Sequence, residues 1–434
     1  MFASPSRLDL YFVLRPNQNG DMKTIISQRH LTHFPPLPLL PIEIDYNSWG
    51  KSVTTREMDR ILAALKHPDR IRGIALTGSA DDFNKLFKET RRPFPALENL
   101  QVALCDRSHK RLEIPAAFLK GTYLNLRTLK LKHVSLPSIS RFLSSVPALT
   151  DLTLVFYINV CPLPVMSFLS YLRRMPFLRR LKLEMGGKNR EIDGLVQPTK
   201  PKEKLTLTKL ISFHFRGYSA FLNTLVAAVA APSVREIDID LYDTSTRPLI
   251  PHLPRFIDDI GESYHAVQVA MDRDCFYFLL FTQSEYVGRH SPHLRLCTDR
   301  FESAMHTSNA FSAKLNAAEE LILIFAFAPD PEEDTPWHTF FQHFPSVKAL
   351  RVLGSYSLHI ASALHQDHGG LNPAFLPALE EIEICHSRPP HCSGGDSERV
   401  AEREAFEPFV LARRQAGHQV KVVKSNRGLD DIWR

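Results

Sequence analysis

The chain has 434 residues, of which 44% are hydrophobic and 23% charged, so its composition excludes a disordered protein and allows about three domains or one long repeat array. Proline outnumbers glycine by 31 to 18, the reverse of average usage, which argues against a glycine-rich nucleotide-binding fold. The 53 Lys and Arg exceed the 47 Asp and Glu only slightly, and this dilute excess does not indicate a nucleic-acid partner.

The cysteine content and the chain start bear on the cellular compartment. Six cysteines in so long a chain are sparse, and no Asn-x-Ser/Thr acceptor occurs, as expected of a protein with reduced thiols. Asp9 interrupts the apolar run near the start, unlike the core of a signal peptide. No apolar run approaches the roughly 18 residues of a membrane span. We therefore expect a cytoplasmic or nuclear protein that does not bind membranes.

One phrase, apolar-x-x-apolar-x-apolar, recurs along the chain and predicts a series of short strands, because apolar residues that alternate share one face of a strand. Between these phrases the apolar spacing is helical, over residues 56–65, 139–146, 165–174, 220–230, 338–343 and 402–416. Clear phrases begin at Leu97, Leu126, Leu149, Leu178, Leu210, Val234, Val347 and Leu379, and weaker ones at residues 71, 264, 291 and 318.

The spacing of these phrases predicts the fold class. It averages about 28 residues, inside the range of leucine-rich repeats. We expect an α/β leucine-rich-repeat solenoid with irregular repeats, a curved parallel sheet on the concave side and helices on the convex side. Prolines two residues before a phrase end each helix and mark the repeat register; they are Pro95, Pro147, Pro176, Pro232, Pro345 and Pro377.

The end of the predicted array has its own features. Polar, charged or Pro/Gly-rich runs at residues 186–204, 329–336 and 386–398 are expected to be insertion loops. The helix over residues 402–416 is basic and amphipathic, so it either caps the array or seeks a membrane, and we favour the cap. Pro408 is expected to kink or split this helix, and a strand around Val422 to close the sheet.

No motif indicates catalysis, a cofactor or a metal. Cys385, His386, His391 and Cys392 could ligate zinc, but adjacent Cys-His pairs are not a standard ligand spacing, and an ordinary loop is the favoured interpretation. The His-Gly-Gly run at residues 368–370 resembles an oxyanion-hole loop, but the sequence has no Gly-x-Ser-x-Gly motif that would supply the nucleophile. We therefore predict that the protein is not an enzyme and has no catalytic residues, cofactor or metal.

The concave wall is the candidate binding surface. Its side chains come from the positions that alternate with the buried ones. They change from basic to acidic along the array. This charge pattern could orient a protein partner as it binds. Alternatively, these side chains are only solvated polar residues without a partner. The candidate residues are Lys130, Lys132, Lys182, Glu184, His214, Arg216, Asp238 and Asp240.

Five runs, in this order, resemble a known family: residues 35–46 (PPLPLLPIEIDY), 63–72 (AALKHPDRIR), 93–97 (PFPAL), 377–379 (PAL) and 409–418 (FVLARRQAGH). The chain is similar over residues 1–424 to the large family of F-box proteins with irregular leucine-rich repeats in mushroom-forming fungi. The family's N-terminal F-box binds a Skp-type adaptor of a cullin–RING ubiquitin ligase, and its repeats are taken to choose the substrate.

The resemblance implies a division of the chain. Residues 1–38 would be a remnant or cap that follows a missing F-box, residues 39–385 the repeat array, and residues 386–434 an insertion loop, a capping helix and a closing strand. Residues 40–44 (LPIEI) only superficially match an F-box start and occupy the family's first strand after it. Either the sequence is truncated or this member has lost its coupling to the ligase.

Two functions follow from the resemblance. The chain is the substrate-binding arm of a ubiquitin-ligase receptor, with a protein substrate and, if an upstream F-box exists, a Skp-type adaptor as partners. Alternatively, it is a stand-alone leucine-rich interaction scaffold. An enzyme is a distant third.

Overall fold

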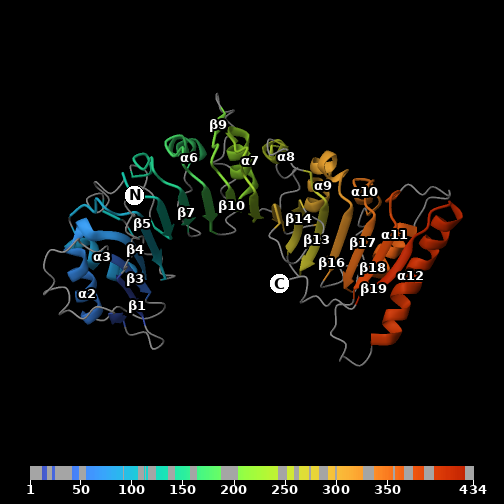
Figure 1. The fold of residues 1–434 in the computed structure, drawn as a ribbon, viewed down its shortest axis with the longest axis horizontal. Coiled ribbons are helices and arrows are strands. Elements are labelled where there is room, and N and C mark those ends of the chain that lie inside the picture. Colours follow the sequence, from blue (N-terminus) through green and yellow to red (C-terminus); the bar gives the residue numbers. More distant parts are fainter. Residues whose placement is uncertain are drawn as a thin grey trace, which may run out of the picture. The chain divides into compact units, whose positions relative to one another are not determined.

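A computed structural model describes the protein. It covers residues 12–16, 22–24, 42–47, 55–90, 92–105, 112, 114–115, 124–134, 142–156, 164–186, 204–242, 252–258, 263–272, 275–282, 292–298, 301–325, 337–354, 357–365, 375–385 and 395–425. The chain divides into two compact units, Met1–Ser212 with Ala228–Ser233, and Phe213–Ala227 with Val234–Arg434. Each unit is a mixed α/β structure with a mostly parallel sheet (Figure 1).

The sheet of the first unit is parallel from β3 to β8, and each strand pairs with the next one in the sequence. Strand β1 pairs parallel with β3 and antiparallel with β2, so residues before 39 also add strands to this sheet. Its strands are β1 (Phe12–Pro16), β2 (Met22–Thr24), β3 (Ile42–Asn47), β4 (Ile71–Gly78), β5 (Asn99–Leu104), β6 (Thr128–Lys132), β7 (Asp151–Phe156) and β8 (Arg180–Met185). Its helices are α2 (Thr55–Leu65), η1 (Pro68–Arg70), α3 (Ala80–Glu89) and α6 (Val165–Leu172), and β9 (Leu205–Thr206) pairs separately with β11 (Val229–Ala230).

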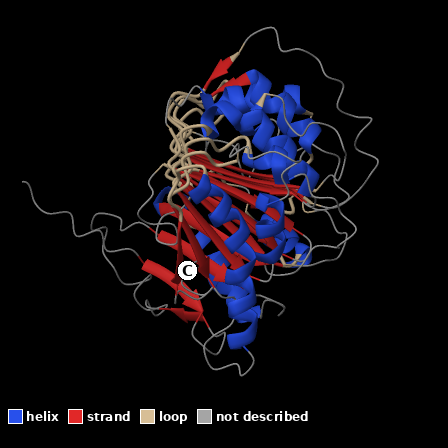
Figure 2. Cartoon of the chain, turned by 90° about the vertical axis from the view of Figure 1, so that its right-hand side faces the viewer, coloured by secondary structure: helices blue, strands red, loops and turns tan. Residues whose placement is uncertain are grey.

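The second unit contains β10 (Ser212–Gly217), β12 (Glu236–Leu241), β13 (Ala266–Asp272), β14 (Cys275–Phe281), β15 (Leu294–Thr298), β16 (Glu320–Phe325), β17 (Ala349–Gly354), β18 (Glu381–Cys385) and β19 (Lys421–Ser425). Its helices are α7 (Ser219–Ala228), α8 (Leu253–Asp258), α9 (Phe301–Leu315), α10 (Trp337–Phe341), α11 (Ser357–His365) and α12 (Gly395–Gln415). In Figure 2, where this unit faces the viewer, helices lie along one face of the sheet.

Alternating burial along several strands contributes to the core, as the strand phrases predict, whereas β16 is buried throughout. In β5, β6 and β8 the Leu, Val and Met residues are buried and the residues between them are not. Leu100, Leu129, Leu152 and Leu181 lie opposite one another in four neighbouring strands and are at most 2% exposed. The residues that alternate with them form what we call the polar face of each sheet, because charged side chains occupy many of its positions.

The prolines sit in tight turns immediately before the strands. In five of them, the N–H of the residue two positions after the proline donates to the C=O of the residue before it, at 2.9–3.4 Å. The turn Phe94-Pro95-Ala96-Leu97 is one example, and the same bond closes around Pro147, Pro176, Pro345 and Pro377. Proline suits the second position of such a turn because its φ is already fixed there. The prolines therefore mark the strand register, as predicted.

The region between β12 and β16 departs from the expected parallel order. Strand β14 was not predicted; it pairs antiparallel with β13 on one side and with β15 on the other. As a result β12 lies beside β15, not beside β13, and β13 pairs with β16. The apolar run of β14 (CFYFLLF) and the short connection from β13 favour an antiparallel pair, which needs no crossover helix.

The last helix also differs from the prediction. Helix α12 begins at Gly395, not near residue 402, and continues through Pro408 without splitting. Its buried face carries Phe406, Phe409 and Arg413, and it packs against α11. Arg413 is 2% exposed, and its Nη2 donates to the carbonyl oxygens of Leu376 (3.1 Å) and Pro377 (2.9 Å). Packing and these bonds outweigh the single backbone bond that Pro408 removes. The expected closing strand, β19, pairs parallel with β18.

The expected loops at residues 186–204 and 329–336 lie almost entirely outside the described residues, as do residues 386–394 of the third. Residues 395–398, also expected to be loop, belong to helix α12. Among the helices that the structure describes, none combines the length and the hydropathy needed to cross a membrane.

Removing a large side chain from the buried row should destabilise the fold. Leu181→Ala creates a cavity beneath β8 and should lower the free energy of unfolding by about 2–5 kcal/mol, measured by urea denaturation. Leu124→Ala is the matched control, because Leu124 is 70% exposed, and it should change that free energy by about 0.5 kcal/mol or less. Equal effects of the two substitutions would contradict the assignment of the buried row.

Candidate functional site

The polar face of the second unit carries a cluster of charged and aromatic side chains. Its residues come from β10, β12, β14 and β15, where the positions between them are filled by buried residues such as Phe213, Ile237 and Leu296. The polar side chains therefore point away from the core. They include four predicted site residues, His214, Arg216, Asp238 and Asp240, together with Arg295, Tyr242, Tyr277 and Cys297.

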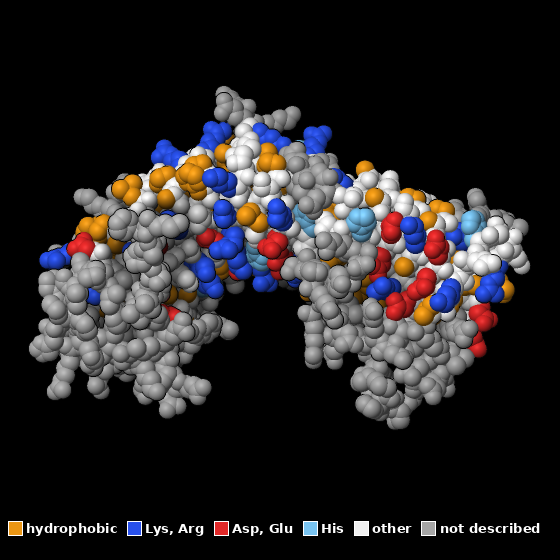
Figure 3. Space-filling model, viewed as in Figure 1, with side chains coloured by type: hydrophobic (Ala, Val, Ile, Leu, Met, Phe, Trp, Pro, Cys, Tyr) orange, Lys and Arg blue, Asp and Glu red, His pale blue; other side chains and the backbone are white. Residues whose placement is uncertain are grey.

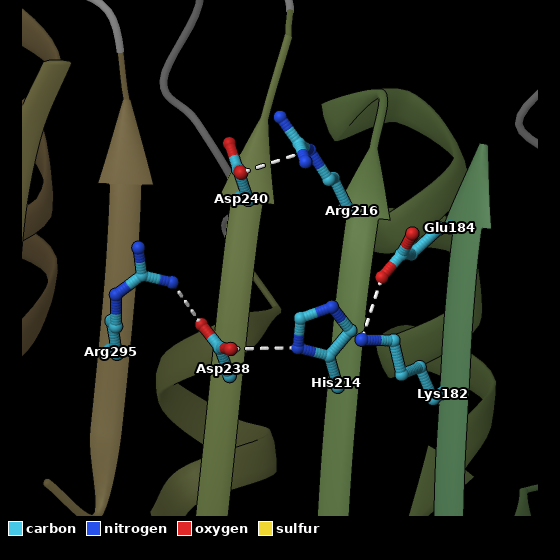
Figure 4. Close-up of polar contacts among 7 residues, drawn as sticks. All are labelled: Lys182, Glu184, His214, Arg216, Asp238, Asp240 and Arg295. Atoms are coloured by element: carbon cyan, nitrogen blue, oxygen red, sulfur yellow. Dashed lines mark hydrogen bonds and ion pairs between the residues drawn. The ribbon is translucent and has the colours of Figure 1, made fainter. Parts of the chain in front are cut away.

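Asp238 is the centre of this cluster (Figure 4). One carboxylate oxygen lies 2.7 Å from Nδ1 of His214, and the other accepts a hydrogen bond of 2.5 Å from Nη1 of Arg295. Asp238 and Arg295 are register partners in the parallel pair of β12 and β15, which explains their closeness. The carboxylate is thus held between groups from both neighbouring strands.

These contacts determine the charge of the pair. Burial tends to raise the pKa of Asp238, but the hydrogen bonds from His214 and Arg295 outweigh it and hold that pKa below its ordinary value. Burial also acts against the charge of Arg295, yet its bond to Asp238 leaves the pKa of Arg295 raised. Both groups therefore stay ionised at neutral pH.

A second ion pair lies beside the first. Nε of Arg216 is 3.1 Å from a carboxylate oxygen of Asp240, and the guanidinium lies 5.3 Å from the ring centre of Tyr242. Tyr242 in turn meets Tyr218 edge to face, with ring centres 6.2 Å apart. The ring and the carboxylate together restrict the rotamers of Arg216.

The groups around Arg295 are poorly suited to nucleophilic chemistry. Its guanidinium lies 5.1 Å from the ring centre of Tyr277, which is the register partner of Cys297. Burial first, and the negative charge of Asp240 second, raise the pKa of the Cys297 thiol far above its ordinary value. Burial likewise raises the pKa of Tyr277 to about 12. Both groups stay protonated at neutral pH, and a protonated thiol is a weak nucleophile.

The first unit carries the other four predicted residues on the polar face of β6 and β8. Lys130, Thr153 and Lys182 lie in one lateral row, and Lys132 and Glu184 flank Val155 in the next. Nζ of Lys182 is 2.7 Å from a carboxylate oxygen of Glu184, a pair also drawn in Figure 4. Lys130 and Lys132 form no ion pair with another described residue, so among the described residues they are the available cations of these two rows.

The charges are therefore more balanced than the sequence pattern indicated. The expected acidic wall at Asp238 and Asp240 is paired with His214, Arg216 and Arg295. Arg295 was not among the predicted residues because its strand phrase, from residue 291, is weak. Its alternation with Leu294 and Leu296 was the signal that could have identified it.

Farther along the second unit, the polar face changes character. Nε of Arg351 lies 2.7 Å from Glu320 and 3.0 Å from Glu383, both on neighbouring strands. Beside it, Ile322 and Ile324 occupy positions expected to be displayed, yet both are at most 2% exposed and pack with Leu353 and Ala270. This part of the face is covered and is not a candidate surface.

Metal binding has no support in the described part of the chain, where no group of three or more His, Cys, Asp or Glu side chains is arranged to hold an ion. The side chain of Cys385 and residues 386–392 lie outside the described residues.

Comparison of the chain with protein-family models gives no matching family, and comparison with curated proteins gives no matching relative.

The Asp238 cluster predicts a pH dependence. A carboxylate whose pKa is lowered on folding stabilises the folded state above its unfolded pKa, near 4, and this contribution is lost as the pH falls through the lower folded value. Asp238→Asn should therefore be less stable than the parent at pH 7, and the two should converge as the pH falls below about 4. Urea denaturation at several pH values measures this difference, and a difference that is the same at pH 7 and at pH 2.5 would contradict it.

Proposed function

We propose that the chain is a protein-interaction scaffold, a leucine-rich-repeat solenoid whose polar face binds a protein partner. The observation that carries this proposal is the Asp238 cluster, in which each polar side chain is held by neighbours on adjacent strands. Side chains whose rotamers are already restricted lose less conformational entropy on binding. Fixed charges of both signs favour one orientation of a partner over others.

Recurring backbone bonds support the repeat part of the proposal. The carbonyl of Glu98 accepts from the N–H groups of Arg127 and Thr128 at 2.8 and 3.0 Å. The carbonyl of Arg127 accepts in the same way from Thr150 and Asp151, also at 2.8 and 3.0 Å. The same arrangement recurs in the second unit, where the carbonyl of Glu319 accepts from the N–H groups of Lys348 and Ala349. A turn that joins its neighbour identically at each strand start is the expected sign of stacked repeats.

The favoured form of this function is the substrate-recognition part of an F-box-type ubiquitin-ligase receptor in the cytoplasm or nucleus. Its support is the ordered series of runs that resembles the fungal F-box family, together with a sheet face that displays charge. The alternative, a stand-alone binding protein, shares the interaction surface but lacks the adaptor.

Co-purification separates the two forms of the proposal. The tagged protein, expressed in a mushroom-forming fungus from the full transcript including all coding sequence upstream of Met1, should elute with a Skp-type adaptor and a cullin. A matched preparation from a transcript that starts at Met1 should lose both proteins and retain the substrate. Absence of the adaptor from the full-transcript preparation would leave the stand-alone scaffold as the function.

Charge reversal tests the polar face itself. Lys130→Glu, Lys132→Glu and Lys182→Glu together should weaken partner binding about 10-fold or more, because they reverse the cationic row while leaving the core intact. Isothermal titration with the partner recovered above measures the change. The control is the exchange Lys182→Glu with Glu184→Lys, which keeps the pair and the net charge and should alter affinity less. Unchanged affinity in the triple variant would remove this row as the binding surface.

A further inference from the structure

A pocket of about 520 Å³ opens in the first unit where β6, β7 and β8 begin. Four cationic side chains and one carboxylate line it, together with an aromatic ring; these are Arg127, Arg179, Arg180, Lys209, Asp151 and Phe177. Asp151 and Arg180 are the first polar-face residues of β7 and β8, but none of the pocket residues is among the predicted binding residues, so the pocket needs its own explanation.

Backbone bonds between neighbouring turns build the pocket. The carbonyl of Arg127 accepts from the N–H of Thr150, and the carbonyl of Thr150 accepts from the N–H of Arg179 at 2.7 Å. Arg127, Thr150 and Arg179 therefore stand side by side at three successive strand starts. Neighbouring strands are about 4.8 Å apart, so the two arginine backbones are about 10 Å apart with a short side chain between them. Thr150, with Ala148 beside it, leaves the space that the pocket occupies.

Two of the four cations are already engaged. Arg180 donates to the carboxylate of Asp151, which also accepts from Oγ1 of Thr150 at 2.7 Å. Nζ of Lys209 lies over the ring of Phe177, 4.4 Å from its centre. Arg127 and Arg179 have no ion pair with another described residue. The pocket therefore offers two guanidinium groups that pair with no described carboxylate, and together they match a compact dianion better than a single carboxylate.

Apolar side chains flank these cations on the surface. Phe177 is 47% exposed and Ile211 is 38% exposed, and the N–H of Ile211 donates to the carbonyl of Arg179. Figure 3 shows Lys and Arg side chains beside hydrophobic ones over this part of the first unit. Cations next to an exposed aromatic ring suit a peptide whose anionic residue has an apolar neighbour.

We propose that this pocket binds the phosphoryl group of a phosphorylated serine or threonine on a protein partner. Arg127 and Arg179 would each donate to phosphoryl oxygens, whose charge of about −1.5 to −2 at pH 7 balances the two guanidinium groups. Phe177 and Ile211 would contact an apolar residue next to the phosphorylated one. The inference rests on the proposed function in that it assumes a protein partner, but it uses a different set of residues.

The test uses the purified full chain and three degenerate peptide libraries that differ only at a fixed central position, which is phosphoserine, serine or glutamate. The chain is immobilised, and the retained peptides are quantified by mass spectrometry. The parent should retain the phosphoserine library at least about 10-fold over the serine library, since each charge-assisted contact contributes about a factor of 10. Inorganic phosphate at millimolar concentration should compete.

The variants assign the retention to the pocket. Arg127→Glu with Arg179→Glu should abolish it, whereas Lys85→Glu with Arg92→Glu makes the same change in net charge at exposed positions outside the pocket and should preserve it. If circular dichroism shows that the first double variant does not fold, Arg127→Gln and Arg179→Gln are each expected to lower retention about 10-fold. Phe177→Ala should remove any preference for an apolar residue beside the phosphoserine.

Three results would overturn the proposal: equal retention of the phosphoserine and serine libraries, equal retention of the glutamate and phosphoserine libraries, or retention unaffected by the Arg127 and Arg179 substitutions. The failure of the broader function is distinguishable, because its test reverses Lys130, Lys132 and Lys182 and uses the recovered partner. If the polar face still binds its partner but the pocket does not bind phosphopeptides, only the proposal for the pocket is refuted.

Discussion

The lateral register of the parallel strands is the constraint on which the other features depend. Leu129 of β6 lies opposite Leu100 and Leu152, and this buried row determines that Lys130 lies opposite Gln101 and Thr153 on the other face. A slip of one residue would place the lysine in the core and the leucine in solvent, at a cost of several kcal/mol. The positions of the charged side chains on the polar face are thus determined by the packing of the residues between them.

The buried residues and the polar face contribute unequally to stability, so the residues of the polar face can be substituted more freely. Half-exposed ion pairs such as that of Arg216 and Asp240 contribute little to stability, typically about 0–1 kcal/mol. The buried leucines contribute far more and tolerate little change. Residues on the polar face can therefore change with the partner while the core stays constant. Two lysines of this face differ in the charge that they offer to a partner. Lys182 is partly neutralised by Glu184, whereas Lys130 pairs with no described carboxylate.

The sequence predicted what depends on local alternation and missed what depends on distant partners. The apolar residues of the run Leu126-Arg-Thr-Leu129-Lys-Leu131 predict both strand β6 and its buried face. Pro176 likewise marks the turn before β8. Strand β14 was missed because its run CFYFLLF is apolar throughout, and a short apolar run alone does not distinguish a strand from a buried helix segment. Its place in the sheet depends on its antiparallel pairing with β13 and β15. The burial of Arg413 could not be predicted either, because it depends on hydrogen bonds to the carbonyl groups of Leu376 and Pro377, which are distant in the sequence.

The pocket at Arg127 and Arg179 illustrates a second kind of surface that alternation cannot reveal. Asp151 and Arg180, the first residues of β7 and β8, pair across the strands, but Arg127, Thr150, Phe177 and Arg179 lie in the turns before the strands, outside the strand register. What creates the pocket is a difference in size between successive turns, since Thr150 is short where both of its neighbours in the backbone ladder are arginines. Inside a strand, each side chain is constrained by the packing and pairing of its neighbours, whereas in a turn one side chain can be substituted without affecting the others. Binding chemistry can therefore accumulate at the strand starts without any cost to the buried rows, and the cationic pocket with its exposed phenylalanine is the expected outcome of that freedom.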